Sequence, residues 1–119
     1  MELSTATHFP TETHSDIFEV IVMGMGATPK ERMKNEASNL SPDGRKTFST
    51  GAMLMVERKD FETGALEVAP SKSDSVHSLS GVKCELTKIY KAEGKIWVLP
   101  YVSNGRLAYS ITCEDLLEL

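Results

Sequence analysis

The segment Ile96–Cys113 constrains the fold of this chain most, because it predicts a β-hairpin whose register is fixed. Asn104-Gly105 is the dipeptide best suited to a two-residue type I′ turn, which needs positive φ at both positions. One face of the predicted ribbon pairs Val102 with Leu107, Pro100 with Tyr109, Val98 with Ile111 and Ile96 with Cys113. The other face pairs Tyr101 with Ala108, Leu99 with Ser110, Trp97 with Thr112 and Lys95 with Glu114.

The two faces of this ribbon differ in chemistry. The first is apolar throughout, and we expect it to belong to the core. The second places Trp97 and Tyr101 among small and polar partners, which could leave both rings bare for stacking. Four positions along a strand correspond to roughly 13 Å, so the two rings could act only as separate stacking points.

Length and composition indicate one ordinary globular domain. The chain has 119 residues, of which 40% are hydrophobic and 25% charged. No apolar run approaches the ~20 residues of a transmembrane helix, and no secretory signal is recognisable at the N-terminus. We expect residues 1–15 to form a mobile arm and residues 16–119 to form the domain. With only Cys84 and Cys113, a reducing cytoplasm is the simplest location.

The remaining pattern predicts a mainly β fold, a five- or six-stranded OB-like barrel. An apolar strand is expected within residues 16–25, and Val82–Thr87 alternates as a half-buried strand should. Thr28-Pro29 looks like a helix start, so one short helix is expected over Pro29–Asn39. Gly51 lies inside a predicted strand, where a strongly curved sheet needs a kink. A β-sandwich remains the alternative.

Catalytic, metal and cofactor patterns are absent from the sequence. The three histidines fall in predicted arm and loop, and the two cysteines have no CxxC spacing. Cys84 and Cys113 share the parity of apolar neighbours and are interpreted as buried thiols. We therefore expect a protein that is not an enzyme and that needs no cofactor or metal. An enzyme whose site is assembled from dispersed residues stays open as a third hypothesis.

Charge is distributed unevenly along the chain, although the net charge is −4. Residues 28–59 carry seven bases and four acids, and residues 82–106 carry five bases and two acids, so each segment has a net charge of +3. Binding of single-stranded nucleic acid needs ring faces for bases and cations for phosphates. The residues that could supply them are Arg45, Lys46, Phe48, Arg58, Lys88, Tyr90, Lys95, Trp97 and Tyr101.

The layout resembles the small OB-fold single-stranded DNA-binding proteins of phages and plasmids, of the filamentous-phage helix-destabilising type. The resemblance is carried by the opening apolar strand, the turn Asp43-Gly44-Arg45-Lys46-Thr47-Phe48 and the closing hairpin. It implies sequence-independent binding of single-stranded DNA, often by a homodimer, through basic and aromatic side chains such as Arg45, Lys46, Phe48, Arg58, Trp97 and Tyr101. The acidic net charge and the inserted helix depart from that family.

Two functions are therefore predicted from different classes. The first is a non-enzymatic single-stranded DNA-binding protein, acting as a homodimer or higher homo-oligomer away from any membrane. The alternative is a β-barrel protein–protein interaction module that binds no nucleic acid, because Tyr and Trp are also enriched at protein interfaces.

Overall fold

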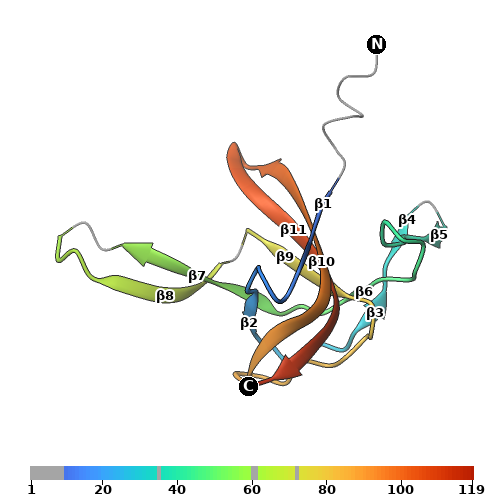
Figure 1. Cartoon of the computed structure of the whole chain (residues 1–119), viewed down its shortest axis with the longest axis horizontal. Helices are drawn as coiled ribbons and strands as arrows, with labels where there is room; N and C mark the ends of the chain where they lie inside the picture. Colours follow the sequence, from blue (N-terminus) through green and yellow to red (C-terminus); the bar gives the residue numbers. More distant parts are fainter. Residues whose placement is uncertain (1–9, 35, 60–61, 72) are drawn as a thin grey trace, which may run out of the picture.

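The computed structural model describes residues 10–34, 36–59, 62–71 and 73–119, and these residues form β-strands and loops without a helix (Figure 1). The strands are β1 (Thr11–His14), β2 (Ile21–Met23), β3 (Lys30–Glu31), β4 (Met33–Lys34), β5 (Ala37–Ser38), β6 (Phe48–Ser49), β7 (Met53–Lys59), β8 (Leu66–Ser71), β9 (Ser75–Ser78), β10 (Ile89–Ser103) and β11 (Arg106–Glu118). The mainly β class predicted from the sequence is confirmed.

Nine of the strands form one sheet, in the order β3-β6-β9-β11-β10-β2-β7-β8 with β1 added to β10. All neighbours are antiparallel except β9 and β11, which run parallel. The order ends at β3 and β8, and no pairing among the described residues joins these ends, so the closed form of the expected barrel is not supported. The β7–β8 hairpin and the separate β4–β5 ribbon extend from opposite sides of the body (Figure 1).

The hairpin predicted from Asn104-Gly105 is confirmed. The φ angles are 51° at Asn104 and 74° at Gly105, as a type I′ turn requires. Every predicted pair from Val102–Leu107 down to Ile96–Cys113 is present in β10 and β11, and only the pair Lys95–Glu114 is replaced by a bulge.

The bulge lies between Glu93 and Ile96 and lets β10 change partners along its length. Before it, Ile89–Lys91 pair with β2, and after it, Lys95–Val98 pair with β1. Gly94 has a φ of 87°, and a Cβ there would come within 2.5 Å of a Glu114 carboxylate oxygen. The strand therefore continues through this glycine and bends there.

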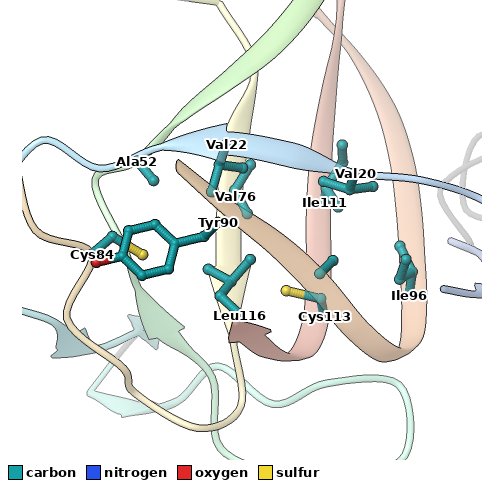
Figure 2. Close-up of a cluster of buried hydrophobic side chains, with 11 residues drawn as sticks. Val20, Val22, Ala52, Val76, Cys84, Tyr90, Ile96, Ile111, Cys113 and Leu116 are labelled. Atoms are coloured by element: carbon teal, nitrogen blue, oxygen red, sulfur yellow. The ribbon is translucent and has the colours of Figure 1, made fainter. Parts of the chain in front are cut away.

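The core lies on the inner face of the hairpin, where Ile96, Ile111 and Cys113 meet β2 and β9 (Figure 2). This face is core over only half its length. Val102 and Leu107, near the hairpin tip, keep 74% and 62% of their surface exposed. The prediction that the whole apolar face is buried is thus wrong, because no other described strand reaches the tip.

The helix expected over Pro29–Asn39 is also wrong. Lys30 and Glu31 pair with Ser49 and Phe48 as β3 and β6, and the following chain folds into the β4–β5 ribbon. Glu36 has a φ of 65°, which a right-handed helix does not allow. The apolar residues at helical spacing, Met33, Ala37 and Leu40, are all exposed, so a helix here would have had nothing to pack against.

Val82–Thr87 is a connecting segment and not the expected strand. Cys84 is fully buried, but Leu86 two positions later is 61% exposed, and Thr87 has a φ of 66°. The segment bonds instead to the distant loop that follows β2, with the Gly26 N–H donating to the Cys84 carbonyl. At the other end of the chain, the sheet already begins at Thr11, within the expected arm; residues 1–9 of that arm lie outside the described part.

Candidate nucleic-acid interface

A row of five side chains crosses the outer face of the sheet, opposite the core. The cross-strand partners are Trp97, Thr112, His77, Ser49 and Lys30, contributed in turn by β10, β11, β9, β6 and β3. Directly opposed residues of neighbouring strands project to the same side of a sheet. We call this surface the Trp97 face.

Trp97 is not the bare ring that stacking would need. Only 2% of its surface is exposed, and its indole Nε1 donates a hydrogen bond of 3.1 Å to Glu12 Oε1. Glu12 is its partner in β1, the strand that the sequence placed in the arm. The ring is thereby held within the sheet, and almost none of its surface is available to a ligand.

The other predicted rings are engaged within the protein as well. The Tyr101 hydroxyl donates to the Ser73 carbonyl oxygen at 2.6 Å, and the ring is half-buried. Tyr90 is buried in the core, where its hydroxyl accepts the N–H of Glu85 at 2.8 Å (Figure 2). Phe48 is half-buried, with its ring against Gly81.

Three of the predicted cations are paired with carboxylates. Arg45 contacts Asp43 and reaches Glu114 at 2.9 Å, although these acids are far apart in sequence. Hydrogen bonds from Arg45 and then Ser41 lower the pKa of Asp43 to about 2. The Lys95 N–H and then Arg45 also hold the pKa of Glu114 below its usual range.

Lys46 lies 3.7 Å from Glu31, and Lys88 lies 2.7 Å from Glu85 and 3.6 Å from Glu118. Lys95 is exposed and has no carboxylate partner among the described residues. The backbone of Arg58 is in β7, and its side chain lies outside the described part.

The structure brings together a different pair of cations. A cleft of about 470 Å³ lies between the Trp97 face and the 32–42 segment that crosses it. Arg32, Lys34, Asn39, Trp97, Leu99 and Thr112 are among its lining residues, and none of the described lining residues is acidic. Neither cation has a carboxylate partner among the described residues. Such a cleft attracts anions.

Arg32 is fixed in this position by its backbone. Its N–H donates to the Thr47 carbonyl at 2.8 Å, and its own carbonyl accepts the N–H of Asn39 at 2.7 Å. The side chain is half-buried, and this burial lowers the pKa of the guanidinium from its usual value. A partly desolvated charge without a counter-charge is costly, and a bound anion would offset that cost.

His77 lies in the same row as the cross-strand partner of Thr112, and it lines a separate hollow with Ser49 and Thr50. Burial, and secondly the charge of Arg32, lower its pKa to about 4, so the imidazole is neutral at physiological pH. Its Nδ1 is buried and has no hydrogen-bond partner among the described residues. The charge of Arg32 therefore acts on this side chain, although His77 does not line the cleft.

Sequence reasoning missed Arg32, Lys34 and His77 as site residues. The first two were assigned to a helix, on which residues two apart face different directions. In an extended segment, residues two apart lie on the same side of the chain. The two-residue spacing of Arg32 and Lys34 was therefore the sequence signal that could have placed them together. His77 was assigned to a loop that in fact contains β9.

A second hollow, of about 690 Å³, lies on the inner side of the hairpin beyond the core. It is mostly apolar, and Phe18 and Tyr109 on its rim are 43% and 39% exposed. Val98, Pro100, Leu54 and Ile111 also line it. This hollow continues the apolar face whose tip is Val102 and Leu107.

Comparisons with protein families, with curated proteins and with solved structures found no match for this chain. Within the described residues, no three His, Cys, Asp or Glu side chains gather as metal ligands would. The same residues contain no helix of a length and apolarity that would cross a membrane.

Proposed function

We propose that the protein is a non-enzymatic single-strand nucleic-acid-binding protein with OB-like strand topology, whose binding surface is the Trp97 face. The observation that carries the proposal is the cleft that Arg32 and Lys34 line together, with no carboxylate among its described lining residues. Lys95, which has no carboxylate partner in the part of the chain that the structure describes, extends the positive surface along β10. DNA is the nucleic acid that the family resemblance favours.

The strand pairing supports the OB-like part of this proposal. β2, β7 and β8 form an antiparallel meander, and β10 joins β2 to β11. β9 follows β8 after three residues and pairs in parallel with β11. If β8 and β9 are one strand interrupted by a bend, the order is that of a five-stranded, partly open Greek-key barrel.

Phosphate contacts would supply most of the affinity in this arrangement. The rings of Trp97, Tyr101 and Tyr90 are held by internal hydrogen bonds, so stacking contributes less than the sequence suggested. Contacts to phosphate carry no sequence information, and their strength falls as salt rises. The expected behaviour is weak, sequence-independent binding on an otherwise acidic protein.

Anisotropy titration of labelled oligo-dT, repeated between 50 and 200 mM salt, tests the proposal. Arg32→Gln and Lys34→Gln should each weaken binding and reduce the salt slope by about 0.7, the value for one phosphate contact on a single strand. Lys83→Gln is the matched control, since Lys83 is an exposed cation outside the cleft. Absence of salt-dependent binding at micromolar protein would refute the proposal.

A second candidate function, a protein–protein interaction module, is favoured by the apolar hollow at Phe18 and Tyr109. The family resemblance makes a second copy of this chain the first partner to test. Tyr109→Glu should abolish self-association in analytical ultracentrifugation, whereas Leu86→Glu, at an exposed leucine outside the hollow, should not. A monomeric wild-type protein at 100 µM would remove the homo-oligomer from this candidate function.

The reducing cytoplasm stays part of the proposal. Cys84 and Cys113 are unpaired thiols and both are buried, which suits a compartment in which disulfides are rare.

A further inference from the structure

We infer that the Arg32–Lys34 cleft is a discrete site for a phosphate monoester, either a nucleoside monophosphate or the phosphorylated end of a strand. The preference for strand ends rests on the proposed function, because the cleft is part of the surface assigned to the strand. Binding of a free monophosphate does not depend on it.

Charge complementarity distinguishes a monoester from the internal phosphates of a strand. Arg32 and Lys34 place two positive charges in the cleft, and the part of the lining that the structure describes contains no acid. A phosphate monoester carries a charge of about −1.5 to −2 at pH 7, whereas each internal diester carries −1. A single monoester therefore neutralises both cations, and a single diester leaves one of them unpaired.

The position of Arg32 favours a fixed anion over a loosely held one. The two backbone hydrogen bonds to Thr47 and Asn39 set its place before any ligand arrives. Its half-buried guanidinium has already lost part of its hydration, so part of the cost of desolvation is met when the protein folds. A planar guanidinium can then donate two parallel hydrogen bonds to phosphate oxygens.

The remaining walls suit the organic part of such a ligand. Asn39 and Thr112 offer donors and acceptors, while Leu99 and Trp97 contribute apolar surface. The volume of about 470 Å³ lies within the ~300–1,000 Å³ that is typical of small-ligand sites. One nucleotide fits the cleft, with its phosphate at the cations and its sugar and base toward the apolar wall.

The test compares dT8 bearing a 5′-phosphate, a 3′-phosphate or only hydroxyl ends, together with thymidine monophosphate and thymidine as free ligands. Binding is followed by the NMR shift of the Trp97 indole N–H, which reports on the cleft itself. One of the two phosphorylated strands should bind at least about fivefold more tightly than the hydroxyl strand at low salt, because it adds charge at a site of two cations. The monophosphate should saturate the shift, and thymidine should not.

Lys34→Gln should remove the preference for the phosphate, and Lys83→Gln should keep it. Lys34 is exposed, so this variant tests the site even where Arg32→Gln disturbs folding. Equal affinity for all three strands, without a saturable shift from the monophosphate, would overturn the inference while strand binding stands. Saturation by the monophosphate without any strand binding would support the site and refute the proposed function instead.

Discussion

Lowering the pH from 7 to 4 should destabilise the folded protein through one side chain, His77. Burial and the neighbouring Arg32 lower its pKa from 6.5 to about 4 in the folded state. The unfolded chain therefore binds a proton between these two values that the folded chain does not bind. Stability consequently falls as the pH drops below 6.5, and this contribution to the loss is complete near pH 4.

The size of the effect follows from the two pKa values. The difference between 6.5 and about 4 corresponds to about 3 kcal/mol, at about 1.4 kcal/mol for each pH unit. His77 keeps some contact with solvent, which reduces this value, and we take about 2 kcal/mol as the expected loss. That is a large fraction of the 5–15 kcal/mol of a typical domain.

The assay is urea unfolding followed by Trp97 fluorescence at several pH values from 7.5 to 4, for the wild type and His77→Gln. The variant lacks the titrating group, so its stability should fall by about 2 kcal/mol less over this interval. Arg32→Gln should raise the pKa of His77, visible as an upward shift of its NMR titration midpoint. Identical pH profiles for wild type and His77→Gln, or a midpoint of 6 or above, would refute the reasoning.

Three further predictions concern packing and exposure. Gly24→Ala should destabilise the fold by roughly 3 kcal/mol or more in the same urea assay, because the new Cβ would lie 2.0 Å from a backbone oxygen. Gly44→Ala is the control and should cost about 1 kcal/mol, because its Cβ would meet open space and only the φ of 88° is unfavourable. Trp97 should emit at short wavelength and resist acrylamide quenching, since only 2% of its surface is exposed; strong quenching would contradict its burial. Cys84 and Cys113 should react with a thiol reagent at pH 8 only after unfolding, because burial raises both pKa values, that of Cys113 to about 12.

The hairpin could be predicted because its determinants are local. Asn104-Gly105 fixes the turn, and the two-residue period of a strand then fixes every pair that follows. The sequence did not determine how far neighbouring strands would extend along the hairpin. The described part of β1 pairs with β10 no nearer the tip than Val98, so Val102 and Leu107 remain exposed on a face whose pattern is that of a core.

The helix prediction was wrong because the structure of this segment is determined by long-range pairing and not by local signals. Thr28 and Pro29 are good local start signals, but such signals are worth about 1 kcal/mol and tertiary pairing overrides them. Lys30 and Glu31 instead join a strand 17 or more positions away, through the pairs with Ser49 and Phe48. The secondary structure of a short segment with few apolar residues is determined by the strand that it pairs with, and a single sequence does not specify that strand.

The candidate site depended on the same long-range pairing. Residues 28–59 have the net positive charge that the count predicts, but Arg45 and Lys46 are held by Glu114, Asp43 and Glu31. Glu114 lies outside the counted segment, so its effect on Arg45 could not be included.

A carboxylate partner already supplies a paired cation with its counter-charge, and an incoming phosphate must compete with it. A cation without a partner gives its full attraction to the ligand, and partial burial increases that attraction because the local dielectric constant is lower. Anion binding by an acidic protein is thus determined by which bases remain unpaired after folding, and the net charge says little about it. In this chain Lys30 on the Trp97 face, Arg32 and Lys34 beside it, and Lys95 on β10 have no carboxylate partner among the described residues, and Arg32 and Lys34 share one cleft.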